Sequence, residues 1–437
     1  MSNAYDNAVN YLYGLEKFGI SFGLHKITAL LKPFDNPQDK LKVIHIAGSN
    51  GKGSTAAIIE SVLMSQGYSV GLYTSPHLVR FNERVRVNEE DISDEDIVNY
   101  VLRLKPYADK INLKDPVTFF DFTTALAYLY FSDKGVDFAI METGLGGKLD
   151  STNVIKKSVV SVITNISKEH EEFLGDDLTA IATEKAGIIK ANGKVTTAEE
   201  NSEVLSVFQR VANEKNASLN ILQKNVEINN KNYNTFDYLS DINKFFDLRC
   251  NLLGYHQIIN ASLAIFSLEK IGIEINEKKL REALVKVKWE GRLEKISDNP
   301  LFFIDGAHNP SGAKVLKKTL KRIKHNKLIF VMSVMKDKDI DGFLYSLMDI
   351  ADIVIFTQAK IERAADLELL RNKGEKYKKD IIVCGDIPLA IKKSVEISEE
   401  DDMICFTGSL YAVGEAKEYF GVAKGLFSLG NNYKIKR

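Results

Sequence analysis

Short apolar runs rich in valine, isoleucine and phenylalanine alternate along this chain with longer segments of helical period. Such runs are typical of strands that are buried on both faces of a parallel sheet. The alternation therefore predicts an α/β fold with mostly parallel sheets and helical crossovers. In the first part of the chain the expected strands are Val43–Ala47, Ser69–Tyr73, Asp137–Glu142 and Val159–Asn165, with a helix from about Ser54 to Gln66 that Gly67 ends.

A second series of strands predicts a second, smaller α/β domain. Between the two series, residues 221–248 alternate polar and apolar side chains, which indicates antiparallel strands at the edge of the first domain. The polar stretch Leu293–Pro300 separates the series. We therefore expect two domains, residues 1–294 and 295–437. The strands expected in the second are Leu301–Ile304, Leu328–Val334, Ile353–Thr357, Ile381–Cys384 and Met403–Thr407.

Composition excludes several classes of protein. Of 437 residues, 45% are hydrophobic and 27% charged, so the chain can bury sizeable cores. With 58 basic and 59 acidic side chains, no global field draws it to nucleic acid or to anionic lipid. No apolar stretch approaches the roughly 18 residues of a membrane span. Its three cysteines fit neither a disulfide framework nor a metal knot, so we expect an unprocessed cytoplasmic protein.

The first expected strand runs into a glycine-rich segment, Gly48-Ser49-Asn50-Gly51-Lys52-Gly53-Ser54, and then into a helix. This order is typical of a phosphate-binding loop, in which backbone amides and a helix N-terminus hold the phosphates. Lys52 would reach the terminal phosphates and the Ser54 hydroxyl would bind Mg²⁺. The spacing departs from the general pattern, since only two residues separate Gly48 from Gly51. The alternative is a glycine-rich turn with an exposed lysine.

Polar residues follow three of the expected strands. Ser54, Glu142 and His170 all lie at or soon after a strand end, where ligands of parallel sheets bind. A hydroxyl and a carboxylate suit Mg²⁺, whereas imidazole is an unusual ligand for so hard a cation. Taken alone, His170 would be a capping or surface histidine. The presence of Ser54 and Glu142 at neighbouring strand ends favours a metal site that includes His170.

Lys185 lies on the apolar face of an expected helix, four residues after Ile181 and seven after Leu178. Periodicity alone favours a side chain that runs along this face to reach water. The alternative is a desolvated lysine that loses its proton, because a neutral amine can react with CO2 to give a carbamate that binds metal ions.

Several motifs together resemble the folylpolyglutamate synthase and dihydrofolate synthase family, the folate branch of the Mur ligases, over nearly the whole chain. The motifs are GSNGKGS (48–54), TSPH (74–77), ERVR (83–86), ETGLGGKLDSTN (142–153), EKAG (184–187), His256-Gln257 with Asn260, Gly291-Arg292, DGAHNP (305–310) and TGSLY (407–411).

The resemblance implies an N-terminal ATP-binding domain, a C-terminal Rossmann-like domain and a reaction in the cleft between them. The substrates would be ATP, L-glutamate and a pterin-bearing carboxylate, either dihydropteroate or a reduced folate. The carboxylate would attack the γ-phosphate to give an acyl phosphate, which the glutamate amine then opens. The protein would mainly position the groups and screen their charge.

The same resemblance implies roles for individual residues. Asn50, Gly51, Lys52 and Gly53 would hold the phosphates, and Ser54, Ser75, Glu142 and His170 would surround Mg²⁺, with two ions expected. Lys185 matches a carboxylated lysine near the second ion; Lys52, Lys185 and His170 are the candidate catalytic residues. Asn260, Arg292 and Asp305 match ATP-binding positions, and His308 would lie near the phosphates. The alternatives are a polar helix-face residue at Asn260 and a simple helix cap at Asn309-Pro310.

The expected folate pocket comprises Thr118, Phe119, Phe120, Asp121 and Lys148. Here the chain departs from the family's pattern, with Lys148 and Lys26 where arginine is usual, Glu169 for aspartate, and Asp121 for glutamate. Lysine keeps the charge but loses the planar fork that grips a carboxylate.

The choice within the family depends on length and on this pocket. Only 47 residues precede Gly48, whereas peptidoglycan Mur ligases usually carry a substantial domain there, so the folate branch is favoured. Residues 118–121 favour a bifunctional dihydrofolate synthase/folylpolyglutamate synthase. We expect the protein to be a monomer. The alternatives are a single-function folylpolyglutamate synthase and, from another class, a nucleotide-dependent switch that would not need Arg292 or Asp305.

Overall fold

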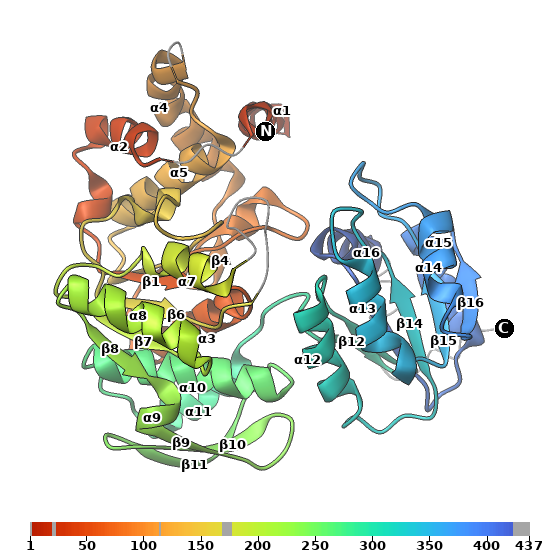
Figure 1. The fold of residues 1–437 in the computed structure, drawn as a ribbon. Helices are drawn as coiled ribbons and strands as arrows, with labels where there is room; N and C mark the ends of the chain where they lie inside the picture. The colour runs from red at the N-terminus through yellow and green to blue at the C-terminus, as the bar shows by residue number, and fades with distance from the viewer. Residues whose placement is uncertain (1, 20–22, 113–114, 168–176, 423–437) are drawn as a thin grey trace. The chain divides into compact units, whose positions relative to one another are not determined.

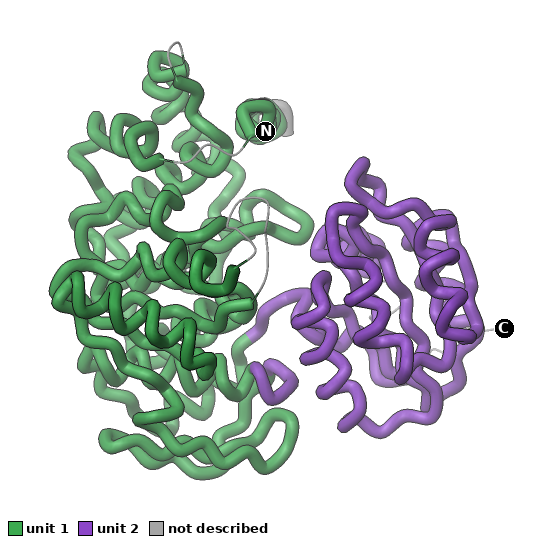
Figure 2. The backbone as a smooth tube through the Cα atoms, in the orientation of Figure 1, with its two compact units in different colours: residues 1–251, 257–287 green, residues 252–256, 288–437 purple. Residues whose placement is uncertain are grey.

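The computed structural model describes residues 2–19, 23–112, 115–167 and 177–422 (Figure 1). The chain forms two compact units (Figure 2). The first comprises residues 1–251 and 257–287, and the second residues 252–256 and 288–437. The α/β class expected from the alternation of strands and helices is confirmed.

The first unit is built on an eight-stranded sheet with the order β4-β3-β2-β5-β1-β6-β7-β8. Its central strands are parallel, and β3 and β4 join one edge antiparallel. Every residue of β1 is buried, because helices cover both faces of the sheet. The strands are β1 (Val43–Ala47), β2 (Val70–Tyr73), β3 (Val85–Val87), β4 (Glu90–Asp91), β5 (Phe138–Glu142), β6 (Val160–Ile163), β7 (Lys194–Thr197) and β8 (Ser218–Ile221).

Two apolar clusters attach helices to this sheet. Val43, Tyr73 and Met141 pack with helices near the N-terminus, and Ala47 and Ile163 pack with α7 (Leu178–Ala186) and α8 (Ser202–Glu214). Helix α3 (Lys52–Gln66) packs on β1, β2 and β5 and against α11 (Glu277–Lys286). The remaining helices of this unit are α1 (Ser2–Gly14), α2 (His25–Leu31), α4 (Asp94–Asn112), α5 (Phe119–Lys134), α9 (Leu222–Asn225) and α10 (Tyr255–Lys270).

The antiparallel strands expected within residues 221–248 are present in the first unit, where they form a sheet of their own. β9 (Val226–Asn230), β10 (Thr235–Ser240) and β11 (Lys244–Arg249) pair in the order β11-β10-β9. Tyr238 and Ser240 of β10 donate hydrogen bonds to the carboxylate of Glu269 on α10, over 2.8 and 3.0 Å. These bonds attach the small sheet to α10, which also reaches the glycine-rich loop.

The second unit contains a six-stranded sheet with the order β12-β13-β17-β14-β15-β16. The stretch expected to separate the domains contains its antiparallel edge strand, β12 (Glu294–Asp298), so the expected domain boundary falls at the first residue of that strand. Because β12 lies at an exposed edge of the sheet, its side chains are polar, and the sequence pattern did not indicate a strand there. The other strands are β13 (Leu301–Ile304), β14 (Leu328–Met332), β15 (Ile353–Phe356), β16 (Asp380–Val383) and β17 (Met403–Thr407).

Helices follow the parallel strands of the second sheet. Phe330, Met332 and Phe356 form its core with Phe343 and Leu347. The helices are α12 (Pro310–Leu320), α13 (Ile340–Leu347), α14 (Leu367–Glu375), α15 (Ile387–Ile397) and α16 (Leu410–Val422).

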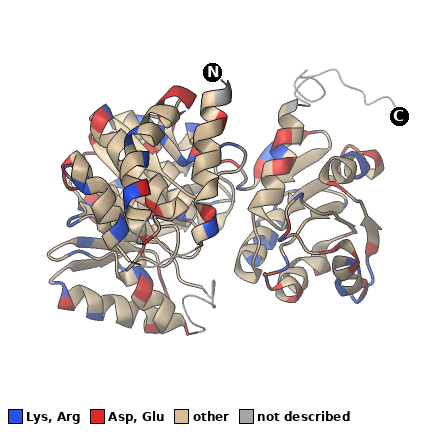
Figure 3. Cartoon of the chain, turned by 90° about the horizontal axis from the view of Figure 1, so that it is seen from above, with Lys and Arg blue, Asp and Glu red and all other residues tan. Residues whose placement is uncertain are grey.

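Charge of both signs is spread over the helices of each unit, and in the view of Figure 3 neither unit presents a continuous face of one sign. Within the part of the chain that the structure describes, no helix combines the length and the apolar character needed to span a bilayer.

Candidate active site

The glycine-rich loop between β1 and α3 is held by the residues that follow β6. The Ser49 amide donates to the Asn165 carbonyl over 2.7 Å, and the Asn50 amide donates to the Asn165 side chain over 3.1 Å. Thr164 Oγ1 donates to the Asn50 carbonyl over 2.7 Å. A Cβ at Gly48 would lie 1.8 Å from Thr164 Oγ1, so only glycine fits there. The loop is thus shaped in advance by neighbouring strand ends.

Helix α3 begins at Lys52, directly after Gly51 in a left-handed conformation with φ of 86°. A Cβ on Gly51 would lie 2.6 Å from Asn260 Oδ1. Lys52 folds over the loop, where its Nζ donates to the carbonyl oxygens of Gly48 (2.9 Å) and Ser49 (3.2 Å). Its ammonium group therefore lies at the mouth of a loop followed by a helix N-terminus, the arrangement that binds phosphate.

Ser54 lies in the first turn of α3 and is 2% exposed. Its hydroxyl accepts a hydrogen bond from Gln257 Nε2 over 3.2 Å, and Asn260 Nδ2 donates to Gln257 Oε1 over 2.9 Å. Asn260 is buried, so it is not simply a polar group on a helix face. Helix α10 therefore supports both the glycine turn and the candidate magnesium ligand.

Ser75 and Glu142 lie together beyond the ends of β2 and β5. The Ser75 amide donates to Glu142 Oε2 over 3.3 Å, and the Glu142 side chain is almost completely buried. Because β2, β5 and β1 are neighbouring parallel strands, their carboxyl ends meet at one edge of the sheet, where the glycine-rich loop begins. His170 and Glu169 lie outside the described residues.

The donor set at this edge fits a hard cation such as Mg²⁺. It comprises a buried hydroxyl at Ser54, a second hydroxyl at Ser75 and the Glu142 carboxylate, which are oxygen ligands. Among the described residues, no group of three or more histidine, cysteine, aspartate or glutamate side chains is placed to hold a metal ion. Mg²⁺ commonly shares its coordination between one or two protein carboxylates and the phosphates of a bound ligand.

Lys185 on α7 is 2% exposed, so its side chain does not run out to water. Its Nζ donates to the Gly48 carbonyl over 2.8 Å. The course along the apolar face to water, which periodicity alone favoured, is therefore wrong, because the side chain turns inward and brings the amine to the glycine-rich loop.

Two residues of the expected folate pocket form a helix cap. Thr118 is the N-cap of α5, and its Oγ1 accepts from the Asp121 amide over 3.1 Å while the Thr118 amide donates to Asp121 Oδ2 over 3.1 Å. Ser151 Oγ donates to Asp121 Oδ1 over 2.7 Å. Both carboxylate oxygens of the buried Asp121 are thus used within the protein, in a capping box that stabilises α5.

The other residues expected in the folate pocket differ in their surroundings. Phe119 stacks on Tyr13 with ring centroids 5.9 Å apart and an interplanar angle of 9°. Phe120 packs so closely on Gly144 that a Cβ there would lie 2.5 Å from its ring. Lys148 is exposed, and its backbone amide donates to the Glu184 carbonyl over 2.9 Å, next to Lys185.

Arg292, Asp305 and His308 lie together in the second unit. Asp305 accepts from the amides of Leu293 (2.8 Å) and Ala307 (2.9 Å). Burial raises the pKa of Asp305, and the Arg292 charge partly opposes that rise. His308 Nδ1 lies 2.9 Å from the Gly306 carbonyl. The residues thus surround one strand end, beyond β13.

Asn309 caps α12, because its Oδ1 accepts from the Gly312 amide over 2.7 Å and Pro310 occupies the first helical position. The simple reading of this pair as a helix start is therefore correct.

The sequence patterns assigned no role to several residues that hold the site residues in place by hydrogen bonds. Gln257, Thr164 and Asn165 hold the glycine-rich loop and Ser54 in place. Glu83 accepts from three successive amides, at residues 78–80, over 2.6, 2.9 and 2.6 Å, and so fixes the loop that carries Ser75. Their place in the quoted motifs or just past a strand end was the only signal.

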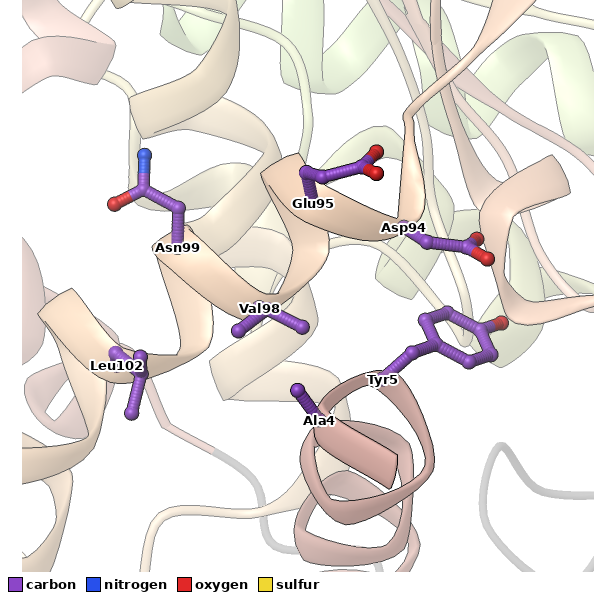
Figure 4. A pocket seen from close by; sticks show the side chains of 7 residues that line it. All are labelled: Ala4, Tyr5, Asp94, Glu95, Val98, Asn99 and Leu102. Carbon is purple, nitrogen blue, oxygen red and sulfur yellow. The ribbon is translucent and has the colours of Figure 1, made fainter. Parts of the chain in front are cut away.

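A separate surface pocket lies between α1 and α4 (Figure 4). It contains none of the expected site residues, and its Asp94 pairs with Arg80 over 2.7 Å. The lining residues are Ala4, Tyr5, Asp94, Glu95, Val98, Asn99 and Leu102.

Comparisons with known proteins agree with this geometry. Residues 46–268 match the Mur ligase middle domain, and residues 291–410 match the Mur ligase, glutamate ligase domain. A dihydrofolate synthase/folylpolyglutamate synthase of Bacillus subtilis is 35% identical over 96% of this chain and 99% of its own length.

Solved structures are similar over nearly the whole chain. The folylpolyglutamate synthase of Thermotoga maritima aligns with a TM-score of 0.85 and 35% identity, over 99% of both chains. A bifunctional folylpolyglutamate synthase/dihydrofolate synthase from Yersinia pestis, complexed with AMPPNP and a Mn ion, has a TM-score of 0.86 and 26% identity, over 95% of this chain and 98% of its own.

Proposed function

Because this chain belongs to the folylpolyglutamate synthase/dihydrofolate synthase family of Mur ligases, we propose that it joins L-glutamate to dihydropteroate and to folates at the expense of ATP. It is an ATP-dependent acid–amino-acid ligase, and the bifunctional form follows from full-length similarity to a relative with both names. The observation that carries the proposal is the loop at Gly48–Ser54, fixed by neighbouring strand ends beside Ser75 and Glu142.

The loop amides, Lys52 and the N-terminus of α3 would bind the triphosphate. Ser54, Ser75 and Glu142 would hold Mg²⁺, with His170 as a further ligand, and a relative crystallised with AMPPNP and a Mn ion supports a divalent metal. When bound, the metal would neutralise phosphate charge. In the second unit, Arg292 and Asp305 would contact ATP, with Asp305 at the ribose, and Asn260 would contribute from α10.

The reaction would proceed in two steps that the protein promotes by orientation. An acceptor carboxylate oxygen attacks the γ-phosphorus and ADP leaves, which gives an acyl phosphate. The glutamate amine then adds to the acyl carbon, loses a proton, and phosphate departs as the amide forms. Lys52 would offset the negative charge that moves onto the leaving ADP, since a fixed cation costs no reorganisation during reaction.

The buried position of Lys185 supports a carbamate there. A neutral amine attacks CO2 and releases a proton, so the side chain gains a negative carbamate while its nitrogen keeps one N–H. That N–H can still donate to the Gly48 carbonyl, where the amine now lies 2.8 Å away. The carbamate oxygens would then serve a second metal ion.

Residues 118–121 and Lys148 remain the proposed folate pocket, with the aromatic rings as its contact surface and Asp121 as its internal support. We also propose that the enzyme acts as a monomer, with residues 1–294 binding ATP and 295–437 serving as the glutamate ligase domain, and that it uses no nucleic acid or membrane partner.

An ADP-release assay tests the function directly. We expect ADP to form only when ATP, L-glutamate and an acceptor are all present, with dihydropteroate and a reduced folate both accepted. Equal ATP hydrolysis without acceptor and glutamate would instead support a nucleotide-dependent switch. Turnover of only one acceptor would identify a single-function enzyme.

A further inference from the structure

Arg84 is a buried cation for which the described part of the chain provides no anionic partner. It ends the short helix η4 (Phe81–Arg84), directly before β3, and its side chain is 8% exposed. Its Nε donates to His77 Nδ1 over 2.7 Å, and its guanidinium carbon lies 5.0 Å from the centre of the Phe119 ring. Among the described residues, no aspartate or glutamate forms an ion pair with it, whereas Arg86 nearby pairs with the buried Glu60.

This arrangement costs free energy in the absence of a ligand. An arginine Nε can only donate, so His77 Nδ1 must present its lone pair, and the imidazole adds no negative charge. The ring of Phe119 gives a favourable but modest contact with the cation. A buried charge normally has an opposite charge beside it, because desolvation is expensive. The described residues give Arg84 no such charge, which leaves a place for an anion that a ligand would bring.

The surroundings of Arg84 indicate what kind of molecule brings that anion. Tyr13 stacks on Phe119, and its hydroxyl lies 3.3 Å from His77 Nε2. Phe81 meets Phe119 edge to face with ring centroids 6.2 Å apart. The cation is thus set among aromatic rings, which suits an anionic group attached to a largely apolar, aromatic molecule.

Arg84 is also close to the proposed metal site. The Thr74 amide donates to the Arg84 carbonyl over 3.0 Å, and the next residue along the chain, Ser75, donates its amide to Glu142. An anion held by Arg84 would therefore lie near the point where the acceptor carboxylate is activated, without being the group that reacts.

We propose that Arg84 binds the α-carboxylate of an acceptor that already ends in glutamate, and so determines how well the enzyme elongates folates relative to dihydropteroate. The inference rests on the proposed function. A glutamate-terminated folate carries an α-carboxylate beside the γ-carboxylate that reacts, whereas dihydropteroate has only its reacting carboxylate. The two terminal nitrogens of Arg84 match a carboxylate in bidentate geometry.

Dihydropteroate and dihydrofolate are a matched ligand pair, because they differ only by that glutamate. We would compare kcat/KM for the two acceptors in the wild type, Arg84→Met and Arg84→Lys, after confirming by circular dichroism that each variant folds. In Arg84→Met the ratio of dihydrofolate to dihydropteroate should fall at least about tenfold, mainly through KM, since the lost partner leaves a charge unpaired. Arg84→Lys should recover part of the loss.

Arg103→Met is the matched control. Arg103 also lies over an aromatic ring, 4.9 Å from the centre of Tyr100, but it pairs with Asp133 over 2.5 Å on the surface of α4. We expect this variant to leave the acceptor ratio unchanged. An equal fall for both acceptors in Arg84→Met, or no fall for either, would overturn the proposal.

We would also measure the equilibrium affinity of the wild type and of each variant for both acceptors. This measurement does not depend on turnover. Arg84→Met should lose at least about tenfold more affinity for dihydrofolate than for dihydropteroate; an equal loss, or none, overturns the role of Arg84. Failure of the proposed function would look different, because the wild type would then release no ADP with either acceptor.

Discussion

Lys52 and Lys185 donate hydrogen bonds to the same acceptor, the carbonyl oxygen of Gly48, over 2.9 and 2.8 Å. The two residues come from different helices, α3 and α7, and two ammonium groups at one carbonyl repel each other. Converting one amine to a negative carbamate would turn this repulsion into attraction. The glycine-rich loop is thus a natural place for the modified lysine that we propose.

The carbamate predicts a specific pattern of loss and rescue. Lys185→Ala should lower kcat on the order of 100-fold or more, because a charged group near the transferred phosphate is lost. A short carboxylate such as acetate should restore part of the activity by replacing the carbamate. Lys190→Ala is the control, since Lys190 Nζ only ties together Asn153 and Ile155. Its defect should be one of stability, and acetate should not correct it. Unchanged activity in Lys185→Ala would remove the role.

The shape of the glycine-rich loop gives a second prediction. Gly51→Ala places a Cβ in a left-handed conformation and against Asn260 Oδ1, so KM for ATP should rise at least about tenfold as the loop is displaced. Gly67→Ala at the end of the same helix carries a similar positive φ of 103° but meets no neighbouring atom. Both variants should lose about 1–2 kcal/mol of unfolding free energy through strain, and only Gly51→Ala should change KM. Steady-state kinetics and urea unfolding separate the two effects.

Patterns within short segments predicted much of the fold. The run at Val43–Ala47 is a strand as expected, because a strand buried on both faces must be continuously apolar. In contrast, β12 was missed, since its residues at a sheet edge keep polar side chains. The helical period placed Lys185 on the apolar face of its helix, but it favoured a side chain that reaches water, because no local pattern shows that the Gly48 carbonyl accepts from the amine.

Long-range pairing limits what the sequence reveals about the site. The motif at residues 83–86 contains two arginines of similar context. Among the described residues, a buried carboxylate pairs with Arg86 alone of the two, and it belongs to a helix that precedes the motif in the chain. Likewise, Asp121 was expected to contact substrate because of its motif, while the structure gives both its oxygens partners in Thr118 and Ser151. The partner of a charged side chain therefore depends on which distant segments of the chain pack against it, and a local motif does not contain that information.

The cap on α5 can be separated from substrate binding by mutation. Asp121→Ala removes the partner of the Thr118 amide and of Ser151 Oγ, so we expect the free energy of unfolding to fall by about 1–3 kcal/mol. KM for ATP should stay the same. Denaturant titration measures the first quantity. If stability were unchanged and only KM for the acceptor rose, Asp121 would contact the substrate directly and the cap would be unimportant.

Stability should depend on pH through His256. Burial, together with the nearby Arg292 charge, lowers the pKa of His256 from 6.5 to about 4. Between these values the unfolded chain binds a proton that the folded chain does not, so stability falls as pH drops from 6.5 towards 4 and is insensitive to this group above 6.5. His256→Gln should reduce the slope of unfolding free energy against pH by up to about 1.4 kcal/mol per pH unit in that window.

Urea unfolding at pH values from 4.5 to 8 measures this slope. The slope of unfolding free energy against urea concentration should stay constant across these pH values, which checks for two-state behaviour. Above pH 7 the histidine is neutral in both states, so the wild-type and variant curves should run parallel there. Curves that stay parallel down to pH 4.5 would show that His256 binds its proton equally well in the folded and unfolded chains, which would contradict the burial of its imidazole beside Arg292.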